Sequence, residues 1–307
     1  MDSLNLLTSG KIKRYFRATK KLSTPGIISH ITQRAAGKEP LFLEDSDYLV
    51  MLKLFKEVAL NCALEIYAFC LMPNHVHFLL SPKESNLFDA MRDLFSRYAT
   101  HFNRKYERKG HLVGGPYRQA VCYDDRYLLA ASLYIHLNPV KASIVNDPMK
   151  YRWSSLGLYS VEDPPKSFVN PDFILGLLSG EKSGRIESYR KLLKQGIEVK
   201  TNHVLEREDA IERFESKLAA IFPVLFKKVE RTKKVAKSSE IDLLGFETLE
   251  RKIGEIKTVS SVKSPEHRKA KKYLMEQLVA RGFTRTEIAE KLEISRKTVY
   301  NILKNSL

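Results

Sequence analysis

Two hydrophobic periods alternate along the first half of the chain. Residues 47–63 repeat apolar side chains at intervals of three and four, which predicts one amphipathic helix. Residues 64–72 and 75–80 are short apolar runs separated by the turn sequence Pro73-Asn74, which predicts two strands joined by a turn. Helix and strand therefore follow one another closely, as in a mixed α and β domain.

The remaining segments of this half complete the pattern. Strands are predicted at 26–33 and 117–123, and helices at 87–109 and 126–137. The last helix is expected to end near Asn138, because Pro139 disfavours helical geometry in the residue before it. The order β-α-β-β-α-β-α predicts an α+β fold, a ferredoxin-like antiparallel sheet with its helices on one face.

Periodicity weakens after residue 150, so the domain limits depend on composition. A helical candidate covers 206–222, and the Lys-rich stretch 227–240 is interpreted as a linker. We therefore expect a first domain at 1–160, a helical connector with a basic linker at 161–240, and a C-terminal domain at 241–307.

The C-terminal domain has a pattern of helices only. An amphipathic helix is predicted at 267–280, a short helix at 287–292 after a capping-box spacing, and a basic helix at 296–304 after the cap residue Ser295. Two short helices joined by a tight turn, the second of them basic, are typical of a helix-turn-helix that reads duplex DNA. The alternative is an ordinary helical hairpin.

The net charge of the chain indicates what kind of partner it binds. The chain carries 52 Lys and Arg against 36 Asp and Glu, a net charge of +16, which favours a polyanion such as nucleic acid. Composition does not separate DNA from RNA or an anionic membrane surface, and a basic protein with no polyanionic partner stays open. Because no long apolar run, signal pattern or paired cysteine spacing occurs, we expect a cytoplasmic protein without a membrane span or structural zinc.

Two histidines form the sharpest short motif. His75 and His77 flank one apolar residue in a predicted strand, so both imidazoles point to the same face. Such a pair can hold Mg²⁺ or Mn²⁺, with Mn²⁺ better suited to nitrogen ligands. Taken alone, a His-x-His pair is more often structural.

A second pair lies on the helix predicted at 126–137. Tyr134 and Asn138 are four residues apart and project from one helix face. A phenol oxygen can attack phosphorus when a metal polarises the phosphate, and the Asn138 carbonyl oxygen could complete the metal site. The alternatives are that Tyr134 packs in the core and that Asn138 merely finishes the helix.

The two motifs together resemble a known family. The runs 71–80 (LMPNHVHFLL) and 134–142 (YIHLNPVKA) are similar to the HUH signature and the tyrosine helix of the REP-associated tyrosine transposases, a branch of the single-tyrosine HUH transposases. Further similar pieces, in order, are 29–34, Arg97-Tyr98, Phe102-Asn103, 115–118 and 153–155. The resemblance covers roughly residues 25–160.

The resemblance implies a specific chemistry. His75, His77 and Asn138 would bind Mg²⁺ or Mn²⁺, and Tyr134 would attack a scissile phosphate in single-stranded DNA near a repeat hairpin. The products would be a covalent 5′-phosphotyrosine and a free 3′-hydroxyl. One departure concerns hairpin recognition, because Ala35-Ala36 follows Arg34 where relatives often carry glycine after the arginine.

Several basic and polar side chains are candidates for DNA contact. In the first domain they are Arg34, Arg97, Arg104, Lys105, Arg108 and Arg118, and in the C-terminal domain Arg296, Lys297, Thr298 and Asn301. A solvated helix face is the competing interpretation for each residue on the long helix.

Three functions remain compatible with this sequence. The first is a tyrosine transposase or endonuclease, the second a DNA-binding regulator with a non-catalytic nuclease-like domain, and the third a metal-dependent hydrolase that uses water. The co-occurrence of His75, His77, Tyr134 and Asn138 favours the first. The sequence leaves monomer and homodimer undecided.

Overall fold

The computed structural model describes most of the chain. The described residues are 15–16, 21, 23–37, 39–122, 124–178, 180–199, 210–232, 234–235, 246–258, 265–280 and 285–304.

A five-stranded antiparallel sheet of order β1-β5-β2-β4-β3 forms the centre of the first domain. Its strands are β1 (Tyr15–Phe16), β2 (Ser29–Arg34), β3 (Leu64–Met72), β4 (His75–Pro82) and β5 (Arg118–Val121). The α+β fold class predicted from the sequence is confirmed. The apolar runs at β3 and β4 are buried along nearly their whole length, as expected of central sheet segments.

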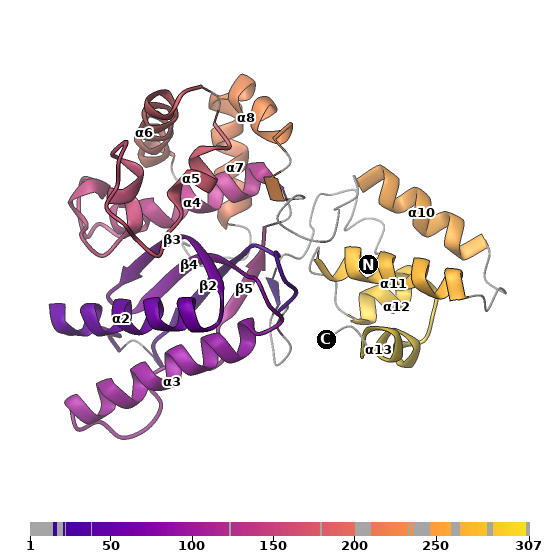
Figure 1. Cartoon of the computed structure of the whole chain (residues 1–307), viewed down its shortest axis with the longest axis horizontal. Coiled ribbons are helices and arrows are strands. Elements are labelled where there is room, and N and C mark those ends of the chain that lie inside the picture. Colours follow the sequence, from indigo (N-terminus) through magenta and orange to yellow (C-terminus); the bar gives the residue numbers. More distant parts are fainter. Residues whose placement is uncertain are drawn as a thin grey trace.

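Two helices, α2 (Asp45–Asn61) and α3 (Leu87–Lys105), cover one face of the sheet (Figure 1). Phe78 of β4 stacks on Phe55 of α2, with ring centroids 4.0 Å apart, and lies 6.2 Å from Phe95 of α3. Each helix contributes its apolar stripe to this layer, which is why the three-and-four spacing predicted both of them.

A third helix, α4 (Asp125–Lys141), lies on the opposite face of the sheet, so the expectation of helices on one face was wrong for α4 (Figure 1). The reason is that every residue of β4 is buried, so both faces of the sheet need a cover. Most of α4 is buried as well, because further helices pack on its outer side.

The end of α4 also differs from the sequence expectation. The helix continues through Pro139 to Lys141 instead of ending near Asn138. Asn138 is fully buried, and its side-chain amide donates a hydrogen bond to the Tyr134 carbonyl at 3.0 Å. Tertiary packing around the last turn therefore outweighs the local preference of the residue before a proline.

The segment expected to be a connector joins the core of the first domain. Its elements are η1 (Pro148–Lys150), η2 (Ser155–Tyr159), α5 (Pro171–Leu175), α6 (Lys182–Glu198), α7 (Ala210–Ile221) and α8 (Pro223–Glu230). Their buried apolar side chains belong to the same cluster as those of the sheet. The predicted limit at residue 160 therefore cuts through one hydrophobic core.

The basic linker predicted at 227–240 is only partly a linker. Residues 227–230 complete α8, and the backbone N–H groups of Lys234 and Val235 both donate to the buried Asp125 carboxylate at 2.8 Å. This clamp at the N-terminus of α4 gives the described part of the stretch a fixed place. The other residues of the stretch beyond 235 lie outside the described residues.

The C-terminal domain has a hydrophobic core of its own. It consists of α10 (Phe246–Thr258), α11 (Pro265–Ala280), α12 (Arg285–Lys291) and α13 (Arg296–Lys304). Ser295 accepts the Thr298 N–H at 3.1 Å, which confirms it as the cap of α13. The expected boundary at 241 and the cap residue Thr284 lie outside the described residues.

Among the helices that the structure describes, none is both long enough and apolar enough to cross a membrane.

A buried polar network holds α4 against its neighbours. His136 contacts the Tyr189 hydroxyl of α6 through Nδ1 and the Ser155 hydroxyl through Nε2, each at 2.8 Å. Ser155 also accepts the Phe69 backbone N–H of β3 at 2.9 Å. Burial lowers the pKa of His136 to about 3, so the imidazole is neutral in the folded protein.

We predict that His136→Ala lowers the free energy of unfolding by about 2–4 kcal/mol, because it leaves two buried hydroxyls with fewer partners and opens a cavity. The native contribution of neutral His136 is fully present above the ordinary histidine pKa of 6.5 and is lost as the pH falls below it. Urea unfolding at several pH values should therefore show a shallower acid dependence in the variant. Equal acid dependence in both proteins would contradict the neutral, buried role.

Candidate active site

The two histidines of β4 lie on the sheet face that α4 covers. The register of β4 with β2 pairs His75 with Arg34 and His77 with Thr32. Both imidazoles are buried, with 6% and 3% of each residue exposed, and their rings stand perpendicular at 4.8 Å. The i, i+2 geometry predicted from the sequence is confirmed.

Hydrogen bonding fixes the state of the His75 ring. Its Nδ1 lies 2.6 Å from the Asn74 amide oxygen, which can only accept, so the ring proton resides on Nδ1. Burial, followed by the positive charge of Arg34, lowers the pKa of His75 to about 3. The ring is thus neutral, with the lone pair of Nε2 available to a ligand.

A third histidine, His30 of β2, supports His77. Nε2 of His30 lies 2.9 Å from Nδ1 of His77, the two rings are stacked at 5.1 Å, and the Thr32 hydroxyl lies 3.3 Å from the same Nδ1. The sequence assigned His30 no role. The sequence can show that His30, Thr32 and Arg34 share one face of a strand. It does not show that His30 lies next to His77, because that contact depends on the pairing of β2 with β4.

Three buried polar atoms of this face have no hydrogen-bond partner. They are Nε2 of His75, Nε2 of His77 and Oδ1 of Asn138. An unpaired buried polar atom costs about 1–3 kcal/mol, so these atoms are candidates for binding a ligand. Two imidazole nitrogens and one amide oxygen form a donor set that could hold Mn²⁺ or Mg²⁺. The described residues contain no group of three or more His, Cys, Asp or Glu able to hold a metal.

Tyr134 lies beside the histidines, on the turn of α4 before Asn138. Its ring is perpendicular to the His77 ring, with centroids 6.4 Å apart. The Asn138 amide donates to the Tyr134 carbonyl, which turns the amide nitrogen away and leaves the oxygen unpaired. Burial raises the pKa of Tyr134, so the phenol is protonated at neutral pH.

Helix α7 closes the site. Phe214 of α7 packs edge-on against Tyr134 at 6.0 Å, and only 2% of Tyr134 is exposed. The Lys141 ammonium lies 5.7 Å from the Phe214 ring centroid and donates to the Val199 carbonyl after α6. Helix α7 therefore covers Tyr134 in this structure. The sequence analysis did not identify Phe214, because nothing local links residue 214 to residue 134.

Two of the predicted DNA-contact residues flank the histidines on the same sheet face. Arg34 pairs in register with His75, and Arg118 pairs with Thr32 on the other side of β2. Burial, followed by the positive charge of Arg118, lowers the pKa of Arg34. Two adjacent arginines beside a ligand site are suited to phosphate oxygens.

The basic residues of α3 have different surroundings. Arg97 bonds Glu57 of α2 at 2.7 Å and Lys105 bonds Asp47 at 2.7 Å, so both cations join α3 to α2. Arg104 is exposed, and Arg108 pairs with Glu39. All four lie on or beside the helix that covers the face opposite the histidines. Their ion pairs support the solvated-helix interpretation more than a role in the histidine site.

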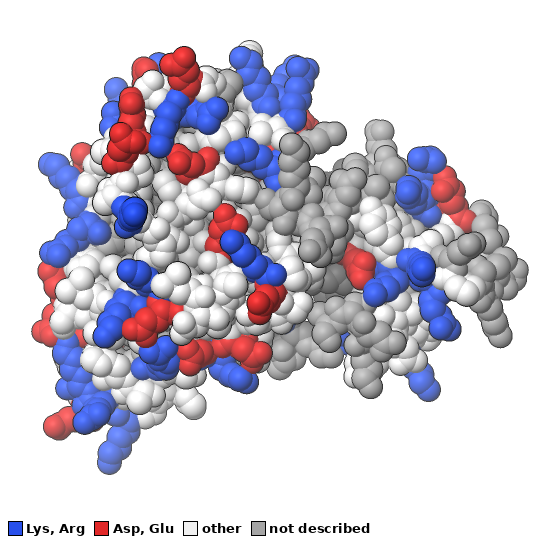
Figure 2. Space-filling view, viewed as in Figure 1, with Lys and Arg blue, Asp and Glu red and all other residues white. Residues whose placement is uncertain are grey.

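Charged side chains are spread over the face that Figure 2 shows. Figure 2 shows several groups of Lys and Arg side chains on one face, with Asp and Glu between them, and no single basic patch. The net charge of +16 therefore does not mark a DNA surface on that face.

The four candidates on α13 differ in exposure. Arg296, Lys297 and Asn301 are exposed, whereas the Thr298 hydroxyl lies 2.8 Å from the Ser295 hydroxyl in the cap. Val299 on the same helix is fully buried in the C-terminal core. The helix thus turns a basic, polar side outward, as a recognition helix does.

Comparison with known proteins agrees with both parts of this geometry. Residues 23–138 match the family described as "Transposase IS200 like", and residues 266–306 match a "Homeodomain-like domain". No functionally curated protein matches the chain. A solved REP-associated tyrosine transposase bound to a REP hairpin is similar at 14% identity, over 54% of this chain and 93% of that one, with a TM-score of 0.42.

The match at 23–138 agrees with the transposase resemblance of the two motifs, and the match at 266–306 agrees with the expected C-terminal helix-turn-helix. The match at 23–138 includes β2, the two histidines of β4, Tyr134 and Asn138. Residues 23–138 are thus similar to the IS200-like transposase family, and residues 266–306 are similar to a homeodomain-like domain.

Proposed function

We propose that this protein is a metal-dependent DNA endonuclease and strand transferase that cleaves and rejoins single-stranded DNA near repeat hairpins through Tyr134. The observation that carries the proposal is the set of three unpaired buried ligand atoms, from His75, His77 and Asn138, beside the tyrosine. The transposase family of residues 23–138 supports DNA as the substrate.

His75, His77 and Asn138 would hold Mg²⁺ or Mn²⁺, which supplies polarisation of the scissile phosphate when bound. The protein's own residues do the rest. The neutral rings leave their Nε2 lone pairs free, and Asn74 and His30 hold the two rings in orientation. Arg34 and Arg118 bind the phosphate oxygens on either side.

Strand cleavage is a transesterification. The Tyr134 oxygen attacks phosphorus and loses its proton, the bond from phosphorus to the 3′ oxygen breaks, and the 3′ oxygen gains a proton. The products are a 5′-phosphotyrosine and a free 3′-hydroxyl. Rejoining reverses these steps and needs no further energy source, because the phosphoester bond energy is conserved in the intermediate.

The two domains would contact different forms of DNA. The histidine face would take single-stranded DNA next to a hairpin, in keeping with the similar protein that is bound to a REP hairpin. The exposed side of α13 would contact the major groove of duplex DNA through Arg296, Lys297 and Asn301.

A second candidate is a DNA-binding regulator with a silent nuclease-like domain. The observation in its favour is the burial of Tyr134 beneath Phe214 of α7. The unpaired ligand atoms weigh against it, because a protein that only binds DNA has no use for them.

We predict that Tyr134→Phe abolishes a metal-dependent covalent adduct with hairpin oligonucleotides, because no other group supplies the attacking oxygen. Denaturing gels with Mn²⁺ or Mg²⁺ and protease treatment measure the adduct. Tyr127→Phe, on the same buried helix, is the matched control and should retain it. Adduct formed by Tyr134→Phe would eliminate this tyrosine as nucleophile, and cleavage without any adduct would indicate attack by water.

We predict that His30→Phe weakens Mn²⁺ binding about 10- to 100-fold, because His77 loses the hydrogen bond that orients its ring. Electron paramagnetic resonance of free Mn²⁺ during titration gives the affinity without DNA or activity. The exposed His101→Phe is the control and should bind as the native protein does. Native affinity in His30→Phe would show that His30 does not support the ligand.

We predict that the double variant Arg296→Ala/Lys297→Ala weakens binding to duplex DNA. The plot of log affinity against log salt concentration should become shallower by about 1–2, because each lost phosphate contact means that about one counterion fewer is released on binding. Arg268→Ala/Lys269→Ala, an exposed pair on α11, is the matched control of equal charge. Fluorescence anisotropy at several salt concentrations measures both. An equal change in the two variants would assign the effect to net charge and not to α13.

A further inference from the structure

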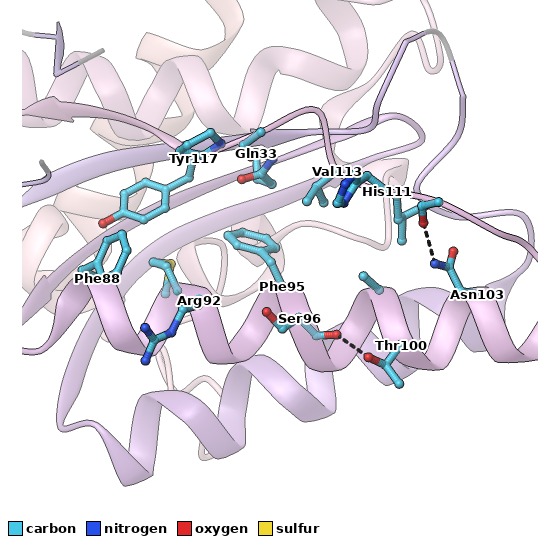
Figure 3. Close-up of a pocket in the computed structure, with 16 residues that line it drawn as sticks. Gln33, Phe88, Arg92, Phe95, Ser96, Thr100, Asn103, His111, Val113 and Tyr117 are labelled. Atoms are coloured by element: carbon cyan, nitrogen blue, oxygen red, sulfur yellow. Dashed lines mark hydrogen bonds between the residues drawn. The ribbon is translucent and has the colours of Figure 1, made fainter. Parts of the chain in front are cut away.

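A pocket of about 390 Å³ lies on the sheet face opposite the histidines, between α3 and the segment 110–117 (Figure 3). Figure 3 shows the rings of Phe88 and Phe95 rising from α3 toward Tyr117 and Gln33 above them. The Gln33 amide donates to the Gly115 carbonyl at 3.1 Å, which fixes the segment that forms the upper wall. The pocket has the size of a small-ligand site and is mostly apolar.

One polar atom in this pocket has no partner. Among the described lining residues, the Tyr117 hydroxyl is the side-chain group that is buried without a hydrogen bond, and only 5% of Tyr117 is exposed. Most other buried hydroxyls of the domain are paired, for example that of Tyr151 with the Leu71 carbonyl at 2.6 Å. An unpaired phenol in a pocket implies a ligand with a hydrogen-bonding edge.

The aromatic side chains that line the pocket indicate which kind of ligand fits it. Phe88 is 40% exposed at the mouth, and the Arg92 guanidinium lies 5.7 Å from its ring centroid. Arg92 pairs with the exposed Asp89, and an exposed pair of this kind contributes little, so the Arg92 charge can still interact with a phosphate. Flat aromatic faces beside a surface arginine form the platform on which proteins stack bases of single-stranded nucleic acid.

The pocket and the proposed catalytic face are formed by neighbouring residues of the same two strands. Gln33 and Tyr117 line the pocket, and the next residues in sequence, Arg34 and Arg118, lie beside the histidine face. Successive residues of a strand point to opposite faces, so the two sites lie back to back where β2 ends and β5 begins. A single strand that leaves the histidine face can pass around these strand ends into the pocket.

We infer that this pocket binds one unpaired nucleobase of the DNA substrate, stacked on the Phe88 ring and hydrogen-bonded at its edge by the Tyr117 hydroxyl. The inference rests on the proposed function for its ligand, and it adds a subsite that selects sequence at a nucleotide away from the scissile phosphate. A base that hydrogen-bonds the phenol is favoured over one that leaves the phenol unpaired.

The test replaces each nucleotide of the single-stranded flanks of a hairpin oligonucleotide, one at a time, with an abasic site. Anisotropy titrations use the full chain in a Tyr134→Phe background without metal, so that cleavage cannot contribute. We expect one position at which the abasic site weakens binding about 5- to 100-fold, the range for loss of a stacked base. Phe88→Ala and Tyr117→Phe should each reduce this position-specific loss and leave other positions unchanged.

Thermal unfolding separates a ligand-binding hydroxyl from a structural one. Tyr117→Phe should not lower the Tm, because it removes a hydroxyl that has no partner, whereas the control Tyr151→Phe should lower it by breaking a hydrogen bond. A Tm loss in Tyr117→Phe as large as that in Tyr151→Phe would overturn the inference. The inference would also be overturned if no nucleotide position showed an abasic effect that depends on Tyr117. That result is expected if another part of the chain fills the pocket. Failure of the proposed chemistry is distinct, since it appears as a missing adduct in the native protein.

Discussion

Strand β4 is buried on both faces, and the other features of the first domain depend on this constraint. One face gives Phe78 to α2 and α3, and the other gives His75 and His77 to α4. Because a helix covers the histidines, they lie away from water and stay neutral, with a pKa of about 3 for His75. Burial thus keeps both imidazoles neutral well below the ordinary histidine pKa.

The same burial has a cost in stability. Nε2 of His75, Nε2 of His77 and Oδ1 of Asn138 lack hydrogen-bond partners at this face, and each such buried atom costs about 1–3 kcal/mol. The large core that runs from Ile28 to Val235 provides the stability that tolerates this cost. Asn138 illustrates the arrangement, since its amide nitrogen bonds the helix backbone while its oxygen stays unpaired.

The region after residue 160 gains a clear role from this arrangement. Helix α7 covers Tyr134 through Phe214, and the carboxylate of Asp125 at the start of α4 receives the backbone that follows α8. These helices complete the burial of α4 and at the same time limit access to the tyrosine. The same contacts therefore cover Tyr134 and pack α4 into the domain.

Local chemistry was readable from the sequence. The two-residue spacing of His75 and His77, the four-residue spacing of Tyr134 and Asn138, and the cap and basic face of α13 follow from the fixed geometry of strands and helices. Strands β3 and β4 and helix α2 were predicted within about two residues for the same reason.

Only the tertiary structure decided which of these local pieces meet. It brought His30 to His77, placed Arg34 and Arg118 beside the histidines, and engaged Arg97 with carboxylates of the opposite face. It also extended α4 past Pro139. These outcomes depend on strand order and on packing between residues far apart in the chain, and periodicity contains no information about either, because it records only which side of its own element a residue occupies.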